Sequence, residues 1–363
     1  MKIGIITLPP SFNYGNILQA WALQTVLERL GHEVDIVIAR PRRYKLPLKK
    51  KPLVYAKRFF LKYILMNKNI IIRYEELLPE LLKYPERFIQ QYLHIHEYNS
   101  FVKIGERDYE AYVVGSDQIW RRRYNSDIRS CYLSFTEDWR VKRIAYAASF
   151  GTTKWEYSSE ETIECARLLS KFDGISVRES DAVNIVKEKF NLKAIHVLDP
   201  TLLLDKEDYV QLFQNASTPH SSGDMLCYIL GKEIEFQGKI KTIATERGLK
   251  PFKVYSRFDD QDAPMSERVQ PPVETWLRGF YDAKLVVTDS FHATVFSIIF
   301  QKPFMLFGSG IRGNERMESL LSMVGFDVSE GIIEKIFTPT STNMEAIKLH
   351  RQEALDFLIK YLN

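Results

Sequence analysis

Short apolar runs alternate with amphipathic segments along most of the chain. Residues 2–8 and 34–38 are rich in aliphatic and β-branched side chains, and residues 18–30 between them have apolar positions at helical spacing. Gly31 follows this segment at the position that favours a helix C-cap. A strand, a helix and a strand joined by short turns predict a βαβ unit.

The same alternation continues through the chain and predicts two α/β domains. We expect residues 1–204 to form a Rossmann-like domain, with the boundary just after Asp199-Pro200, because a proline there cannot continue a helix. Residues 205–335 repeat the pattern and predict a second Rossmann-like domain. The pair resembles the GT-B architecture, with a cleft between two facing domains. That resemblance implies that a final helix within 336–363 packs back on the first domain.

One stretch of the first domain departs from this alternation. Residues 75–98 have the pattern of a helix in which Phe88, Tyr92 and Leu93 face inward. We therefore expect helical structure there, preceded by a basic insertion at about residues 40–74.

Cysteine and histidine usage predicts neither a disulfide framework nor a metal centre. Cys131, Cys165 and Cys227 are odd in number and far apart, which fits a reducing compartment. His94 and His96 are two residues apart and could share one face of a strand, but no third ligand is near them in the sequence. We expect no metal site.

Length and composition are those of a globular protein of two domains. The chain has 363 residues, of which 45% are hydrophobic and 26% charged. A strand begins within the first six residues, which leaves no room for a secretory signal, and no apolar stretch reaches the length needed to cross a bilayer. The expected location is the cytoplasm, with peripheral contact at the inner face of the membrane.

The formal charge of +4 hides a strong asymmetry. Residues 36–74 contain 12 Lys or Arg and no Asp or Glu, so the rest of the chain carries a formal charge of −8. Aromatic and aliphatic residues lie among these basic residues, namely Tyr55, Phe59, Phe60, Tyr63, Ile64 and Leu65. This mixture favours an anionic membrane surface, or help in holding a lipid-diphosphate acceptor. A solvated helix and loop without a partner is the alternative, and one patch in an otherwise acidic protein is weak evidence for nucleic acid, which we do not expect.

Polar residues follow three of the predicted strands. They are Asn13-Tyr14-Gly15 after the first strand, Gly115-Ser116-Asp117-Gln118 after residues 111–114, and Asp289-Ser290-Phe291-His292 after residues 283–288. In open α/β sheets ligands bind at the carboxyl ends of strands, so three such ends suggest one cleft. A simpler explanation for the third is a helix cap at Asp289 or Ser290, with His292 satisfied locally.

Several separated motifs, in one order, resemble those of the polysaccharide pyruvyl transferase family. The resemblance spans roughly residues 1 to 325, and motifs in the right order are more specific than any one alone. Besides the polar residues after the three strands, the matching segments are Leu18-Gln19-Ala20, Ile119-Trp120, Ala145 to Gly151, Ser176 to Ser180, and Asp199-Pro200-Thr201.

The resemblance implies that pyruvate is transferred from phosphoenolpyruvate, as a ketal, onto two hydroxyls of one sugar in a cell-surface or exopolysaccharide precursor. Phosphoenolpyruvate is then a co-substrate, and no cofactor is expected. His292 is the expected proton shuttle, because its intrinsic pKa lies near working pH. Arg178 is expected to grip the carboxylate or phosphate of the donor while Glu179 orients it, although a surface ion pair is the simpler alternative.

The remaining site residues divide between the two substrates. Expected to bind the donor, besides Arg178, are Ser149, Ser290, Arg312 and Arg316. Expected to bind the saccharide acceptor, which the family match allows to be lipid-linked, are Asn13, Tyr14, Gly15, Ser116, Asp117 and Gln118. Trp276, in the helix before the histidine strand, is expected in the core.

One departure from the family concerns the donor. Several members carry an arginine two positions before the histidine, where this chain has Ser290. The charge of that arginine then has to come from another residue, for which Arg312 is a candidate; otherwise the donor differs.

Two other classes of function fit the same residues. A GT-B glycosyltransferase would bind a nucleotide sugar and use the histidine to polarise the leaving diphosphate. A non-catalytic glycan-binding protein would keep the cleft and tolerate the loss of His292.

Overall fold

Two sheets organise the chain. The computed structural model describes residues 1–39, 48–66, 70–231, 233–258, 260–308 and 314–362. In the first sheet the strand order is β3-β2-β1-β4-β5-β6-β7, and all neighbouring strands are parallel. Its strands are β1 (Lys2–Ile6), β2 (Glu33–Ile38), β3 (Ile95–Glu97), β4 (Ala111–Val114), β5 (Lys142–Ala148), β6 (Gly174–Val177) and β7 (Ile195–His196). This order, which runs outward from β1 to both sides, is that of a Rossmann-like domain.

The second sheet is smaller and has the order β12-β11-β10-β8-β9. Its strands are parallel except for β12, which is antiparallel to β11. They are β8 (Met225–Tyr228), β9 (Pro251–Phe252), β10 (Leu285–Thr288), β11 (Phe304–Leu306) and β12 (Ile336–Phe337). The predicted α/β fold of two Rossmann-like domains is therefore confirmed.

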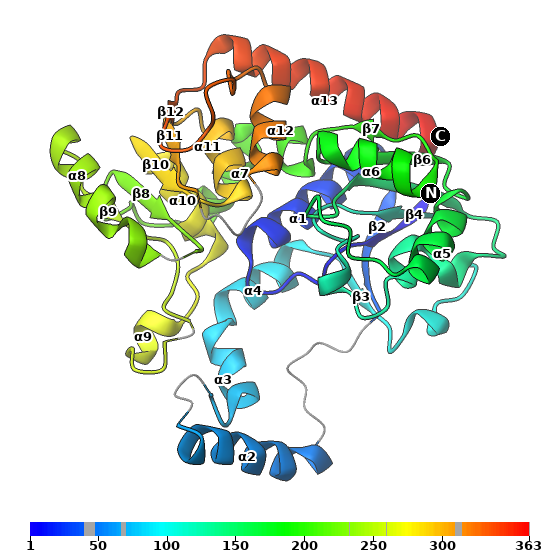
Figure 1. The fold of residues 1–363 in the computed structure, drawn as a ribbon, viewed down its shortest axis with the longest axis horizontal. Coiled ribbons are helices and arrows are strands. Elements are labelled where there is room, and N and C mark those ends of the chain that lie inside the picture. The colour runs from blue at the N-terminus through cyan, green and yellow to red at the C-terminus, as the bar shows by residue number, and fades with distance from the viewer. Residues whose placement is uncertain (40–47, 67–69, 232, 259, 309–313, 363) are drawn as a thin grey trace.

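Helices cover both sheets, and α13 spans the two domains (Figure 1). Near its end Lys142 of β5 donates a hydrogen bond to the carbonyl of Leu362, and earlier Arg351 donates to the carbonyls of Leu202 and Leu204. The helices are α1 (Tyr14–Arg29), α2 (Lys51–Phe59), α3 (Tyr74–Leu81), α4 (Lys83–Tyr92), α5 (Ser159–Leu169), α6 (Ser180–Phe190), α7 (Lys206–Asn215), α8 (Gln237–Arg247), α9 (Met265–Arg268), α10 (Val273–Asp282), α11 (Phe291–Ile299), α12 (Glu315–Met323) and α13 (Ser341–Leu362).

An apolar core continues from one domain into the other. Tyr14 of α1 stacks on Trp276 of α10, with ring centroids 5.5 Å apart, and its hydroxyl donates to the carbonyl of Pro271. Trp276 is fully buried and also contacts Phe296 of α11 edge to face. The expectation that Trp276 belongs to the core is confirmed. Because α1 packs against α10, the carboxyl ends of the two sheets are held toward each other.

Each sheet reverses its strand order at one place. In the first sheet the chain moves from β1 to β2 on one side and later to β4 on the other; in the second it moves from β8 to β9 and then to β10. At such a switch point the connections leave in opposite directions and open a crevice beyond the strand ends. The fold therefore offers two crevices, one at β1 and β4 and one at β8 and β10.

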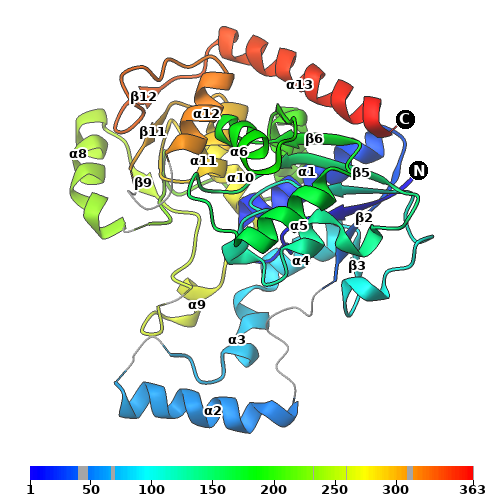
Figure 2. The same ribbon diagram turned by 45° about the vertical axis from the view of Figure 1, so that its right-hand side comes forward.

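An arm stands away from both sheets (Figures 1 and 2). We define the arm as α2, the π-helical turn η2 (Phe60–Ile64) that continues it, and α3. The basic run at 40–47 lies outside the described residues. The expectation of one helical stretch over 75–98 is wrong in part, since α3 ends at Leu81, α4 begins at Lys83, and β3 follows. Pro85 explains the break, because its ring clashes with the carbonyl four residues earlier and it lacks an N–H.

None of the helices in the described ranges combines the length and apolar character needed to cross a bilayer.

Candidate functional site

A cavity of about 410 Å³ lies between the two domains, where the switch points of the two sheets meet. Its volume falls in the range of ordinary small-molecule sites. From the first domain it is lined by Phe12 and Asn13 after β1 and by Asp117, Gln118, Arg121 and Tyr124 after β4. From the second it is lined by Tyr228, Leu230, Tyr255, Ser256, Phe258, Gln270, Asp289, Ser290, Phe291, His292, Arg316 and Met317.

His292 forms a pair with a carboxylate from the other domain. Its Nε2 lies 3.7 Å from Oδ2 of Asp199, and both residues are buried. Thr201 fixes the other carboxylate oxygen, donating to Oδ1 from its hydroxyl at 2.7 Å and from its backbone N–H at 3.1 Å. The carboxylate is thereby fixed with its second oxygen, Oδ2, toward the imidazole.

The first turn of α11 carries His292 and faces the same cavity. Ser290 occupies the N-cap position, but its side chain makes no capping hydrogen bond. The first N–H groups of an α-helix have no partner within the helix, and they attract anions. The cavity thus contains a helix N-terminus as well as the histidine.

Arg178 does not line the cavity, and both of its terminal guanidinium nitrogens contact carboxylates. Its guanidinium contacts Asp199 at 3.1 Å and Asp117 at 3.2 Å, and 1% of its side chain is exposed. The ring of Phe291 covers it, with the guanidinium carbon 4.4 Å from the ring centroid. Burial raises the pKa of Asp199, but the proximity of His292, the charge of Arg178 and the bonds from Thr201 outweigh it and hold that pKa well below its ordinary value.

Gly15 is required for His292 to occupy its position. A Cβ added at Gly15 would lie 2.2 Å from the Nδ1 atom and 2.3 Å from the Cγ atom of His292. No side chain fits in that space, so α1 approaches the histidine with its bare backbone.

Arg316 is a cation without a carboxylate partner. It lines the cavity from the first turn of α12, and it forms no ion pair with any residue in the described ranges. Its buried Nε also lacks a hydrogen-bond partner there. Burial, followed by the nearby positive charge of Arg178, lowers the pKa of Arg316 from its ordinary value, although an arginine remains charged. Glu179 and Asp117 favour its charged form from a greater distance, and a guanidinium without an ion pair at a cavity wall is suited to bind an anion.

Glu179 is close enough to Arg316 to feel its charge, and the pKa of this carboxyl group is raised. Burial raises it most, and the neighbouring charges of Arg178 and Arg316 reduce the effect without reversing it. One carboxyl oxygen accepts a hydrogen bond from the Ser149 hydroxyl, and the other has no partner in the described part of the chain. Glu179 forms no ion pair with Arg316 among the described residues.

The structure brings about half of the predicted site residues to the cavity wall. These are Asn13, Asp117, Gln118, Ser290, His292 and Arg316. Arg312 lies outside the described residues.

Five other predicted residues do not line the cavity. Tyr14 bonds to Pro271, Gly15 packs under His292, Ser116 faces the carbonyl of Ala147, Ser149 bonds to Glu179, and Arg178 is enclosed by carboxylates. All five are buried, Tyr14 and Gly15 in the first turn of α1 and the other three at the ends of β4, β5 and β6.

The prediction from sequence missed several residues of the site. The sequence places Asp199 at a domain boundary and in a motif shared with the family, but it does not mark Asp199 as a site residue. Arg121, Tyr228 and Tyr255 also line the cavity. No local pattern in the sequence marks them, because they are brought there by the packing of the two domains.

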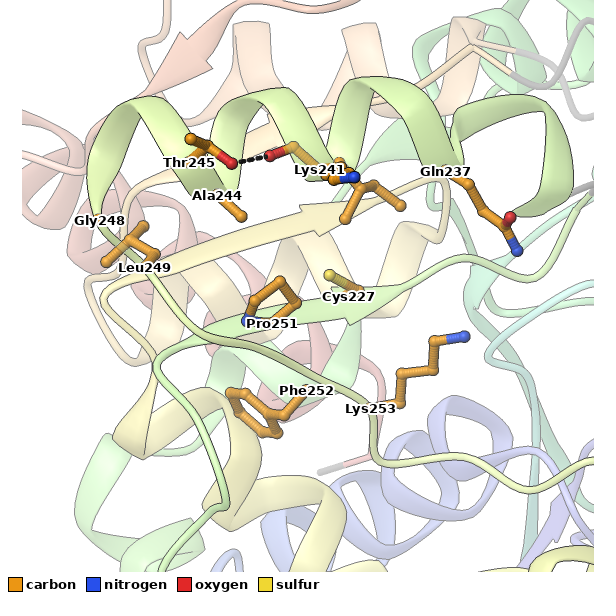
Figure 3. Close-up of a pocket in the computed structure, with 11 residues that line it drawn as sticks. Cys227, Gln237, Lys241, Ala244, Thr245, Gly248, Leu249, Pro251, Phe252 and Lys253 are labelled. Carbon is orange, nitrogen blue, oxygen red and sulfur yellow. Dashed lines mark hydrogen bonds between the residues drawn. The ribbon is translucent and has the colours of Figure 1, made fainter.

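A larger cavity, of about 630 Å³, lies at the β9 edge of the second sheet (Figure 3). Its walls are mostly apolar and come from β9 and from one face of α8, with Lys241 and Lys253 as its charged residues. No acid–base pair lines it, so we place the chemistry in the smaller cavity between the domains. In the described part of the chain no group of three or more acidic, histidine or cysteine side chains is arranged to hold a metal ion.

Comparisons with known proteins identify a family. The family model described as polysaccharide pyruvyl transferase matches residues 13–310. No curated protein is a significant match. Among solved structures, the chain is similar to the MnaA–UDP complex of S. aureus, with 13% identity, TM-score 0.43, and coverage of 99% of this chain and 89% of that one.

Two further solved structures show comparable similarity. For UDP-GlcNAc 2-epimerase from Methanocaldococcus jannaschii the identity is 13%, the TM-score 0.46, and the coverage 98% of this chain and 93% of that one. For ADP-heptose LPS heptosyltransferase II from E. coli the identity is 11%, the TM-score 0.38, and the coverage 100% of this chain and 98% of that one. Likeness at this level carries no argument about the chemistry of this chain.

Replacing Gly15 with Ala is expected to displace the ring of His292. The new methyl group would also lie 2.7 Å from the Cβ of His292, so rotating the ring does not relieve the clash. Overpacking of this kind costs roughly 1–3 kcal/mol, so the melting temperature should fall and the NMR signals of the His292 ring should shift. Gly238→Ala is the matched control, since nothing lies within 4 Å of its added Cβ. His292 signals that stay in place in Gly15→Ala would contradict this geometry.

Glu179→Gln is expected to change how stability depends on pH. The folded state raises the pKa of Glu179 above its ordinary 4.5, so between 4.5 and the raised value the folded protein binds more protons than the unfolded chain. The contribution of Glu179 to stability should therefore be fully present below 4.5 and be lost as pH rises through that window. A neutral Gln does not titrate. The melting temperature of the variant should therefore rise relative to that of the wild type as pH increases through this window.

The control for this experiment is Glu188→Gln, on the exposed side of α6. The melting temperature of this control variant should differ from that of the wild type by the same amount at every pH. A Glu179→Gln curve parallel to that of the wild type would show that Glu179 is not held protonated.

Proposed function

The chain belongs to the polysaccharide pyruvyl transferase family, and on this premise we propose that it transfers pyruvate from phosphoenolpyruvate to a saccharide. The product is a ketal, in which the central carbon of pyruvate bridges two oxygens of one sugar. The acceptor proposed is a sugar of a cell-surface or exopolysaccharide precursor.

The reaction requires one proton to be delivered and two to be removed. The methylene carbon of phosphoenolpyruvate gains a proton and becomes a methyl group, which makes the neighbouring carbon electrophilic. One sugar hydroxyl attacks that carbon, the bond to the phosphate oxygen breaks, and the second hydroxyl closes the ketal. Both sugar hydroxyls lose a proton. In the balanced reaction one proton is gained by the methylene carbon and the other by the released phosphate.

Arg316 and the N-terminus of α11 are the proposed anion site for the donor. Phosphoenolpyruvate carries a phosphate and a carboxylate, and the cavity contains one guanidinium without an anion and one uncapped helix end. Ser290 stands where several family members have an arginine. Arg316 lines the same cavity as Ser290, and we assign to it the charge that this chain lacks at that position.

His292 is the proposed acid and base, supported by Asp199. A histidine paired with a buried carboxylate can carry the proton needed by the methylene carbon and accept one from a sugar hydroxyl. Arg178 has a positioning role, because it holds Asp199 and Asp117 and does not itself line the cavity.

The acceptor is assigned to the wall formed by the first domain. Asn13 and Gln118 present amide groups to the cavity there, and Asp117 presents a carboxylate. Such groups donate to and accept from sugar hydroxyls. Tyr228 and Tyr255 lie across the cavity and provide aromatic surface.

One observation carries this proposal. The cavity at the two facing switch points brings together a histidine–aspartate pair and an arginine without a carboxylate partner among the described residues. These are the two kinds of group that an anionic donor requiring protonation needs.

Arg316→Ala is expected to weaken binding of phosphoenolpyruvate by roughly 10–100-fold, the loss expected when a charged hydrogen-bonding group is removed. Thermal stability with increasing phosphoenolpyruvate measures this, because a ligand that binds the folded state raises the melting temperature. Arg247→Ala, an exposed arginine at the end of α8, removes the same charge elsewhere and should bind like the wild type. If nucleotide sugars stabilise the wild type and phosphoenolpyruvate does not, the donor assignment is wrong and a glycosyltransferase is favoured.

His292→Ala is expected to lower kcat for phosphate release from phosphoenolpyruvate by roughly 10²–10⁴-fold and to leave KM for the donor nearly unchanged. The assay measures phosphate released in the presence of candidate acceptor saccharides. Exposed His220→Ala is the control and should keep wild-type rates. Equal kcat in wild type and His292→Ala would remove the histidine from the mechanism.

A further inference from the structure

The inner face of the arm is polar and is used to hold the arm together. Arg58 donates to both carboxylate oxygens of Glu75 at 2.7 Å, and the hydroxyl of Tyr55 donates to Glu76 at 3.0 Å. Lys62 reaches Gln261 of the second domain at 2.7 Å. Tyr55, Arg58 and Lys62 are three and four residues apart, so they share one side of the helix.

The outer face of the same helix is apolar and uncovered. Leu53, Phe60 and Ile64, separated by seven and four residues, have exposed fractions of 77%, 51% and 61%. Other large apolar residues of the segment are also more than half exposed, namely Leu48, Phe59, Tyr63, Leu65 and Met66. An ordinary surface helix has the opposite arrangement, with polar residues outward.

Basic residues accompany this apolar surface. Lys49, Lys50 and Lys57 are exposed, and none of them forms an ion pair with a residue that the structure describes. The sequence around them, residues 36–74, contains no acidic residue. A partner for this face therefore has to be apolar and negatively charged.

We propose that the outer face of the arm, Leu48 to Met66, binds the surface of an anionic lipid bilayer. Exposed Phe, Leu, Ile and Tyr side chains would enter the boundary between headgroups and acyl chains, while lysines contact the headgroups. Each Lys or Arg near an anionic bilayer adds to the attraction. The contact is peripheral, along the helix.

The arm also lies next to the mouth of the cavity. Tyr74 of α3 contacts Phe258 edge to face, and Phe258 stacks on Phe12; both phenylalanines line the cavity. A protein bound to a bilayer through the arm would hold this opening close to the lipid surface. An acceptor with a lipid anchor would reach the cavity there, a consequence that rests on the proposed function, whereas binding to the bilayer does not.

Sedimentation of the full chain with lipid vesicles tests the binding. Vesicles of phosphatidylcholine with phosphatidylglycerol should carry the protein down, and vesicles of phosphatidylcholine alone should not. Added salt should weaken the binding, because it screens the lysines. The triple variant Leu53→Ser, Phe60→Ser, Ile64→Ser should lower the partition by roughly tenfold or more.

The matched control replaces three exposed apolar residues elsewhere, Ile163, Leu349 and Ile359, by Ser. It should bind as the wild type does, and both triple variants should keep the wild-type melting temperature, since the replaced side chains are exposed. Equal binding by the wild type and the arm variant, or no binding of the wild type to anionic vesicles, overturns the proposal. A wild-type dimer that becomes monomeric in the arm variant, without vesicle binding, would assign the face to a second copy and also overturn it.

A second readout separates this proposal from the proposed function. With a water-soluble acceptor the arm variant should turn over at the wild-type rate, and with a lipid-linked acceptor in anionic vesicles it should be slower. If no acceptor supports turnover but wild-type vesicle binding depends on the arm, the proposed function fails and the membrane proposal stands.

Discussion

The guanidinium of Arg178 is the group on which the arrangement of the site depends. A buried cation is tolerated only when carboxylates surround it, and here Asp117 and Asp199 do so from two separate segments of the chain. The ends of β4 and β6 and the segment at Asp199 are thereby fixed to one another. Since Asp199 also pairs with His292, the same charges that close the first domain set the position of a histidine that belongs to the second.

The two arginines of the site differ in whether carboxylates surround them. Arg178 is enclosed by carboxylates, while Arg316 lines the cavity without an ion pair among the described residues, near a glutamate whose pKa is raised by burial. The first arginine organises the strand ends of the first domain, and the second is the one we propose for the anionic donor. Gly15 completes the arrangement, because its missing side chain lets α1 and α11 meet at His292.

The fold class and the strand ends at the site are readable from the sequence, because apolar periodicity and polar strand ends are local patterns. His292, Asn13 and Asp117 were identified in this way and do line the cavity. Sequence does not distinguish a polar strand-end residue above the sheet from one within it, which is why Ser116, Ser149 and Arg178 were assigned to ligands. The pairing of Asp199 with His292 joins residues 93 positions apart and arises only from domain packing. The basic segment is also evident from composition. Which face of its helix points outward depends on the ion pair between Arg58 and Glu75, which the sequence does not reveal.

The most direct test of the central claim is a crystal structure of the protein with phosphoenolpyruvate bound. The account predicts the donor in the cavity between the domains, with its phosphate or carboxylate oxygens within hydrogen-bond distance of the Arg316 guanidinium and the first N–H groups of α11, and its methylene carbon next to His292. Phosphoenolpyruvate bound elsewhere, or bound in this cavity with its anionic groups away from Arg316 and α11, would contradict it.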